Sequence, residues 1–316
     1  AGEIIKTPGS ESNVKEIFDK CNELRASGED LIIFNQFDEF GNYLWHYTVT
    51  GPAMVEALEA SMQPGETFRG VALATGSAGT IASGDYLKQV FPGSLIGAAE
   101  ATQCPTILYN GFGEHRIEGI GDKHIPWIHN VKNTDAAIGV DDEATISLTR
   151  LFNEPAGKAY LIDQGVKPEL VEQLSLFGIS CIGNMVATIK MAKYYEMGSG
   201  DVLLTVGTDS MEMYQSRLVE LREERGEFTS LDAAASFSRY MLGTGIDYVQ
   251  ELSYYDRKRV HNLKYYTWVE QQGKTYEEIQ AQWYDPDYWS GVHGQIDQID
   301  ELIEQFNEMT GLLKGL

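Results

Sequence analysis

The chain has 316 residues, of which 43% are hydrophobic and 11% aromatic, a composition ordinary for a globular enzyme with one large domain or two modest ones. Its 24 basic against 47 acidic residues leave a net charge of −23, which excludes nucleic acid and anionic lipid as partners. There is no run of apolar residues long enough for a membrane span, no signal-peptide pattern and no CxxC spacing among the three cysteines. We therefore expect free thiols and a cytoplasmic protein.

The first 50 residues predict a short α/β segment followed by an aromatic loop. Strands are expected at residues 3–6 and 31–34, with a helix between them that begins at Asn13. We interpret residues 1–36 as the remainder of a small N-terminal α/β domain. Residues 37–50 read as a loop between domains, in which Trp45, His46 and Tyr47 are candidates to face a substrate.

From residue 51 onward, helices alternate with strands. We predict helices at 53–62, 78–90, 141–152 and 184–195, strands at 69–74, 94–98 and 201–206, and an irregular, site-forming segment at 102–135. Alternation of this kind indicates the α/β class, with an open, mostly parallel sheet covered by helices on both faces. The predicted large domain is 37–217.

Helical patterns dominate a C-terminal extension at residues 218–316. The segment WYDPDYW at 283–289 is interpreted as an aromatic clamp between this extension and the body of the protein. The last helix carries an apolar stripe that fits either packing against the body, which we favour, or a dimer contact. Its members are Ile296, Ile299, Leu302, Ile303, Phe306 and Met309.

The segment VALATGSAGTIASGDYLKQVFPG at 71–93 predicts a strand, a loop of small residues and a helix. Small residues in GSAGT let backbone N–H groups approach an anion, Ser77 and Thr80 can add hydroxyl donors, and the helix directs the positive end of its dipole there. The loop matches neither GxGxxG nor the lysine-containing phosphate loop. Taken alone, it is equally consistent with a phosphate site and with a turn that binds nothing. Glu100 imitates a ribose-binding acid, which keeps a nucleotide-binding oxidoreductase as an alternative.

Three further motifs follow in order: HRIEGIGDKHIP at 115–126, GISCIGNMVATIKMA at 178–192 and GTDSMEMY at 207–214. Together with GSAGT, they resemble the fold type II pyridoxal-phosphate enzymes, specifically the cysteine synthase and cystathionine β-synthase family, which has a tryptophan synthase β-like fold. GSAGT stands at the family's GTGGT loop, and the others are similar to HKIQGIG…IP, GISSGAALAAALKLA and PDSGERY. The resemblance covers roughly residues 1–218.

The resemblance implies pyridoxal 5′-phosphate as cofactor and assigns roles to individual residues. Ser180 would meet the pyridine nitrogen, with Cys181 as the alternative if the register slips by one, and Asp209 and Ser210 would lie nearby. A neutral hydroxyl at that nitrogen suits β-replacement or α,β-elimination on an O-activated serine or related amino acid through an aminoacrylate. The phosphate would be bound by Gly76, Ser77, Ala78, Gly79 and Thr80, and the backbone at Gly119 and Gly121 would approach the cofactor.

The family's Schiff-base lysine and its substrate-carboxylate loop precede the strand and turn that AGEIIKTPGSE at 1–11 resembles. No lysine of this chain matches the family's lysine motif, so we predict no catalytic residue in it. We expect a fragment, inactive alone, of a longer enzyme. The alternative is a short chain that needs a partner or a non-catalytic subunit that keeps the fold.

A metal site is not predicted. His115, His124 and His129 lie within fifteen residues of each other, but no cysteine or carboxylate spacing supports zinc, so solvated or loop-bound histidines are expected. The predicted partners are a small amino-acid substrate and a second copy in a homodimer.

Overall fold

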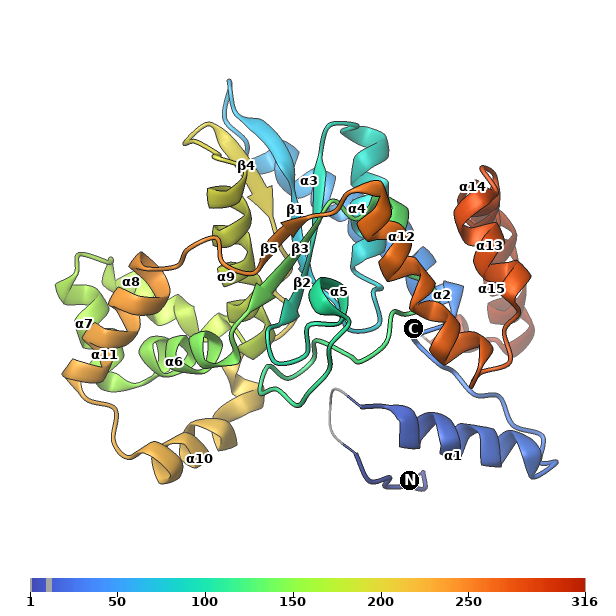
Figure 1. Cartoon of the computed structure of the whole chain (residues 1–316), viewed down its shortest axis with the longest axis horizontal. Coiled ribbons are helices and arrows are strands. Elements are labelled where there is room, and N and C mark those ends of the chain that lie inside the picture. Colours follow the sequence, from blue (N-terminus) through green and yellow to red (C-terminus); the bar gives the residue numbers. More distant parts are fainter. Residues whose placement is uncertain (1, 10–12, 316) are drawn as a thin grey trace.

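The computed structural model describes residues 2–9 and 13–315, and an open sheet forms its centre (Figure 1). Within these residues the sheet has five strands in the order β4-β1-β2-β3-β5. The pairings β4·β1, β1·β2 and β2·β3 are parallel, and β5 runs antiparallel to β3. The strands are β1 Thr67–Ala74, β2 Leu95–Ala101, β3 Ala136–Val140, β4 Asp201–Leu204 and β5 Val249–Glu251.

Helices cover both faces of this sheet, which confirms the α/β class predicted from the alternating pattern. Helices α6 and α9 pack on one face, and α3 and α4 pack on the other. The helices are α1 Lys15–Ala26, α2 Phe40–Trp45, α3 Gly51–Ser61, α4 Ile81–Val90, α5 Thr106–Tyr109, α6 Asp142–Asn153, α7 Pro155–Asp163, α8 Pro168–Gln173, α9 Ile179–Tyr194, α10 Gln215–Arg225, α11 Ser230–Phe237, α12 Tyr254–Asn262, α13 Tyr276–Tyr284, α14 Tyr288–His293 and α15 Ile296–Thr310.

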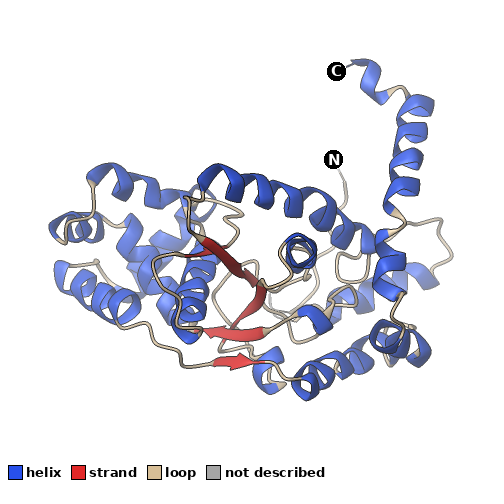
Figure 2. Ribbon diagram, turned by 90° about the horizontal axis from the view of Figure 1, so that it is seen from above, coloured by secondary structure: helices blue, strands red, loops and turns tan. Residues whose placement is uncertain are grey.

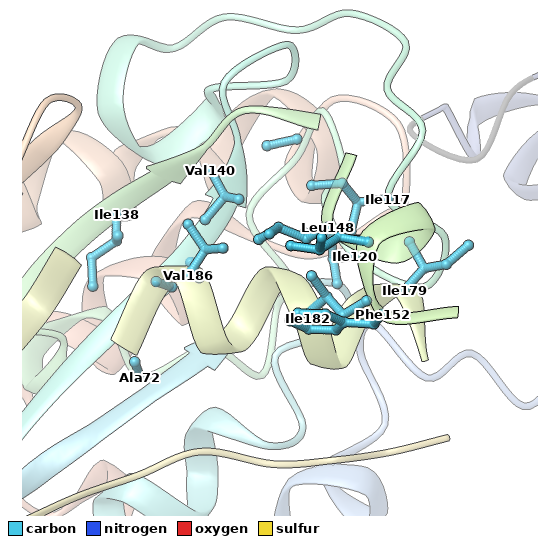
Figure 3. Packing of buried hydrophobic residues seen from close by; sticks show 14 of the residues in the cluster. Ala72, Ile117, Ile120, Ile138, Val140, Leu148, Phe152, Ile179, Ile182 and Val186 are labelled. Atoms are coloured by element: carbon cyan, nitrogen blue, oxygen red, sulfur yellow. The ribbon is translucent and has the colours of Figure 1, made fainter. Parts of the chain in front are cut away.

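The core lies where α9 crosses the sheet. Figure 3 shows Ala72, Ile138 and Val140 from the strands next to Ile182 and Val186 from α9. All five side chains are buried, and burial of each larger one stabilises the fold by about 1.5–3 kcal/mol. Small residues on the strands let the helix approach the sheet closely.

The side chain of Asn184 connects the carboxyl ends of β1 and β4 beyond the residues that pair in the sheet. Asn184 of α9 is buried, its Oδ1 accepts from Ala74 N at 2.8 Å, and its Nδ2 donates to Val206 O at 3.0 Å. Thr205 adds a hydroxyl bond to Ala72 O at 2.6 Å. The carboxyl ends of β1 and β4 are therefore held together at one edge of the sheet by α9.

The two strands predicted in the first 36 residues are wrong. Residues 3–6 and 31–34 form no strand, and Ile4, Ile32 and Phe34 are 83%, 82% and 87% exposed. A lone extended segment cannot pair its backbone groups, and among the described residues no strand lies beside either of these two. The helix between them is present as α1, which packs through Phe18 against the rings of Phe37 and Trp268. The assignment of 1–36 to a separate domain stays a prediction.

The predicted loop at 37–50 is also wrong, because α2 and a wide helical turn at His46–Thr50 run directly into α3. Tyr43 and Tyr47 lie four residues apart and are both buried, so the aromatic residues form one face of a helix. Trp289 from the C-terminal extension contacts Tyr43 at 5.4 Å between ring centroids. The clamp predicted for residues 283–289 is thereby confirmed.

The extension is fastened to the body by more than aromatic contacts. It supplies β5, which pattern reading missed because this strand has only three residues. Lys264 is fully buried and its Nζ donates to Trp127 O and His129 O, each at 2.8 Å, and to Gln282 Oε1 at 2.6 Å. Burial lowers the pKa of Lys264 well below its usual value.

The apolar stripe of α15 does not pack against the body along its length, contrary to the interpretation we favoured. No residue of α15 is buried, and Leu302, Ile303 and Phe306 are 55%, 51% and 56% exposed. In Figure 2 the C-terminal helix projects away from the rest of the chain. Only Ile296 and Ile299 contact the neighbouring hydrophobic cluster.

Among the described residues, no single helix is long and apolar enough to cross a membrane. One pair of helical segments, Pro168–Leu176 and Ile179–Tyr194, reaches that length and hydropathy only when joined, and the two are bent by 115° relative to each other.

Replacing Asn184 with alanine should lower the free energy of unfolding by about 1–3 kcal/mol, because it leaves a part-buried N–H at Ala74 and a part-buried carbonyl at Val206 without partners. Urea denaturation followed by circular dichroism measures the change. Asn262→Ala, on the exposed end of α12, is the control and should change stability by less than about 0.5 kcal/mol. Equal stability of the two variants would contradict the bridging role.

Protonation of His261 should make the protein less stable in acid. Burial lowers its pKa to about 3, so below pH 6.5 the unfolded chain binds a proton that the folded chain does not. From pH 7 to pH 5, the wild type should lose about 2 kcal/mol relative to His261→Gln, which can still donate to Ile279 O. Urea denaturation at both pH values tests this; Asn262→Ala should show no such pH-dependent difference from the wild type.

Candidate functional site

The loop at residues 76–80 lies at the carboxyl end of β1, directly before α4. Within the part of the chain that the structure describes, no acceptor is bonded to the backbone N–H groups of these five residues. Asn42 of α2 holds the loop from outside by donating from Nδ2 to Ser77 Oγ at 3.0 Å. Ala78 has φ 63°, a left-handed conformation that costs a non-glycine residue about 1 kcal/mol. The loop thus presents unpaired donors at a helix N-terminus.

A second loop faces the first. Gly119 and Gly121 have φ values of 85° and 72°, as expected for a turn that requires glycine. Gly121 N donates to Thr75 O at 2.5 Å, which fixes this loop to the end of β1. A Cβ at Gly76 would lie 3.4 Å from Gly119 O, so the two loops approach each other closely.

The third wall is the start of α9, which begins at Ile179 and not at residue 184 as predicted. Ser180 Oγ lies 3.1 Å from Thr208 Oγ1, and both residues line the cavity between the loops. Cys181 lies instead behind this wall, where its Sγ is 3.4 Å from Asp209 Oδ1 and accepts from Thr208 N at 3.2 Å. Ser180, and not Cys181, therefore faces the cavity.

Asp209 lies against the start of α9, where its backbone carbonyl accepts from Gly178 N at 3.1 Å. A Cβ at Gly178 would come within 1.9 Å of Asp209 Oδ1, so a larger residue before α9 would require the Asp209 side chain to move. Tyr214 donates its hydroxyl to Asp209 Oδ2. Ser210 precedes the short helical turn Met211–Tyr214.

The three walls enclose a cavity of about 120 Å³. Sequence reasoning missed Asn184, Val206 and Thr208 in its lining, since nothing in their spacing marked them before the strand ends were placed. His46, one of the candidates in the aromatic segment, also lines it, whereas Trp45 is 61% exposed. Burial lowers the pKa of His46, so the imidazole is neutral at pH 7.

A larger cavity of about 500 Å³ adjoins the first and shares Gly76, Ser77 and the loop around Ile120 with it. Its outer wall is α1 and the segment at 34–37. Among the described residues, no lysine lines either cavity.

Glu100 does not face these cavities as a ribose-binding acid would. It is 1% exposed and accepts from the backbone N–H groups of Ile107 and Leu108, each at 2.8 Å, at the start of α5. Burial raises its pKa to about 7. Glu100, whose position suggested a ribose-binding acid, therefore binds the backbone at the start of α5 instead.

We expected solvated or loop-bound histidines in this segment, and the structure confirms the second alternative for His124 and His129. His124 and His129 are 6% and 1% exposed. His124 Nδ1 lies 3.0 Å from Asp122 Oδ1, and His129 Nε2 lies 2.9 Å from Thr134 Oγ1. Burial lowers the pKa of His129 to about 3. Within the described residues, no group of three or more potential ligands could hold a metal ion.

Comparison with known proteins agrees with this geometry. The chain is 28% identical over 215 residues to a cysteine synthase of Staphylococcus aureus (strain Mu50), covering 68% of this chain and 61% of that protein. Among solved structures, it is similar to a cysteine synthase of Entamoeba histolytica, with a TM-score of 0.54, 19% identity and coverage of 75% of this chain and 62% of the other. An O-acetylserine dependent cystathionine beta-synthase of Helicobacter pylori has a TM-score of 0.50 and 24% identity, covering 65% and 59%.

None of the known protein-family models matches the chain. The chain spans about three fifths of the length of the relative from Staphylococcus aureus, 61%. The shared sequence, the parallel sheet and the order of the loops around the cavity agree on one conclusion. The chain is similar in sequence and in fold to the cysteine synthase family of fold type II pyridoxal-phosphate enzymes.

Proposed function

We propose that this chain carries the cofactor-binding part of a cysteine synthase-like enzyme that replaces or eliminates the β-substituent of an O-activated serine or a related amino acid. The observation that carries the proposal is the loop at 76–80, whose five unbonded N–H groups lie at the start of α4 and line a cavity with Ser180. The name of the Helicobacter pylori relative, O-acetylserine dependent cystathionine beta-synthase, supports an activated serine as substrate.

The residues of the cavity fit pyridoxal 5′-phosphate. Unpaired N–H donors at a helix N-terminus suit a phosphate dianion, which the net charge of −23 would otherwise repel. The Ser180 hydroxyl suits the ring nitrogen because it can donate or accept a hydrogen bond without carrying charge. When bound, the cofactor supplies an electron sink for the α-carbon of an amino acid. The chain's own residues anchor the phosphate, orient the ring and exclude water.

The lysine that holds the cofactor covalently is, in our proposal, supplied from outside residues 1–316. This inference is supported by the lining of the two cavities, which includes no lysine among the described residues. Lys123 is the lysine nearest in sequence to the turn at Gly119 and Gly121, but its Nζ lies over the ring of Phe112, 5.4 Å from the centroid. By this proposal residues 1–316 alone are inactive. A non-catalytic subunit that keeps the phosphate site is the second candidate. The lining of the two cavities, which includes no lysine among the described residues, favours it as well.

We further propose a cytoplasmic homodimer whose ligands are small amino acids and not nucleic acid or membranes. The acidic net charge supports the exclusion of polyanionic partners. Cys21, Cys104 and Cys181 are free thiols, which fits a reducing compartment.

Adding a negative charge to the loop should weaken cofactor binding. Ser77→Asp should reduce the affinity for pyridoxal 5′-phosphate at least tenfold, because its carboxylate repels the phosphate. Ser77→Asn, which has the shape of the aspartate side chain without its charge, should change the affinity less than about threefold. Equilibrium dialysis of both variants measures the affinities, with pyridoxal as the ligand that lacks the phosphate. Equal loss in both variants, or equal affinity of wild type for the two ligands, would contradict the site.

The proposal also predicts where the cofactor becomes attached. After borohydride reduction, the protein from its native source should carry a pyridoxyl group on a lysine outside residues 1–316, and residues 1–316 alone should show no single modified lysine. Peptide mapping by mass spectrometry locates the modification. A stoichiometric adduct on one of this chain's lysines would overturn the assignment, and no adduct on the native protein would favour the non-catalytic subunit.

A further inference from the structure

The larger cavity has mostly apolar walls. Helix α1 contributes Val14, Ile17 and Phe18 to the lining, and Phe34 and Phe37 add two aromatic rings. Such walls favour a ligand with an apolar body, because each square ångström of apolar surface removed from water contributes about 25 cal/mol.

One charged side chain interrupts this lining. Asp122 is 7% exposed, and it is the only acidic or basic residue among the described residues around the cavity. No lysine or arginine in the described part of the chain lies within ion-pair distance of it, and the Nζ of its neighbour Lys123 lies over the Phe112 ring. A carboxylate in this position has lost most of its water without gaining a permanent positive partner.

The orientation of this carboxylate is fixed from behind. Oδ1 of Asp122 accepts from Lys123 N at 2.8 Å and lies 3.0 Å from His124 Nδ1. The His124 ring is held by Phe37 and Trp268, at 4.9 Å and 5.7 Å between centroids. Its Nε2 is buried without a hydrogen-bond partner. With Oδ1 engaged, Oδ2 has no hydrogen bond or ion pair within the described residues.

We propose that Asp122 binds the ammonium group of an apolar amine or amino acid whose body occupies the larger cavity. An ammonium group supplies the positive charge that the carboxylate lacks, and a charge-assisted hydrogen bond in a water-poor site is stronger than a neutral one. Because the cavity adjoins the candidate cofactor site, such a ligand is placed to be the second substrate of a replacement reaction. That assignment as a substrate rests on the proposed function, whereas the binding does not.

The experiment compares 4-fluorobenzylamine with 4-fluorobenzyl alcohol, which has the same body without the charge, by ¹⁹F NMR titration of the full chain. The wild type should bind the amine at least tenfold more tightly than the alcohol. Asp122→Asn should abolish this preference by weakening amine binding at least tenfold, with alcohol binding unchanged. Glu39→Gln, which removes an exposed carboxylate that does not line the cavity, is the matched control and should keep the preference.

The wild-type comparison needs no variant, and circular dichroism checks that Asp122→Asn is folded. Equal affinity of the wild type for amine and alcohol would overturn the proposal, as would the same loss of amine binding in Glu39→Gln. Retention of pyridoxal 5′-phosphate is measured on the same proteins by equilibrium dialysis. A preference for the amine without cofactor retention would support the Asp122 site and contradict the proposed function.

Discussion

The candidate site depends on the amide of Asn184, which holds the carboxyl ends of β1 and β4 against α9. Loops that follow parallel strands meet at one edge of a sheet, but a site forms only if the strand ends stay at a fixed separation. Asn184 sets this separation with one acceptor and one donor, in the first half of the same helix whose start presents Ser180. A change in the separation of these two strand ends would therefore change the shape of the cavity.

The electrostatics of the molecule explain why local backbone groups are needed there. A chain with a net charge of −23 repels anions at long range, so the proposed phosphate site relies on dipoles at close range. Several buried ionisable groups are shifted towards their neutral forms by burial, including Glu100, His129 and Lys264. These three groups lie outside the lining of the two cavities, which leaves the backbone N–H groups of the loop at 76–80 as the donors at the candidate site.

The C-terminal extension has a structural part in this arrangement. Trp289 packs on α2, which carries Asn42 and leads to His46, and Trp268 packs on Phe18 of α1. Lys264 connects the extension to Trp127 and His129, which follow the turn at Gly119 and Gly121 in sequence. Helix α1, which borders the larger cavity, and α2, which leads to His46 of the smaller one, therefore pack against residues beyond 217. Helix α15 extends away from this contact.

Sequence patterns alone determined the α/β class, most of the helices and strands between residues 51 and 206, and the motifs that accompany the loop at 76–80. These features are set by local periodicity and by residue types that few conformations accept. They failed at residues 3–6 and 31–34, where apolar runs read as strands but no neighbouring strand pairs with them. They also failed at 37–50, where the helical face became evident only against Trp289. The choice of Ser180 over Cys181, the burial of Glu100 and the Asp122–His124 pair were decided by tertiary structure, since side chains adjacent in sequence turn to different sides and only packing decides which one meets a cavity.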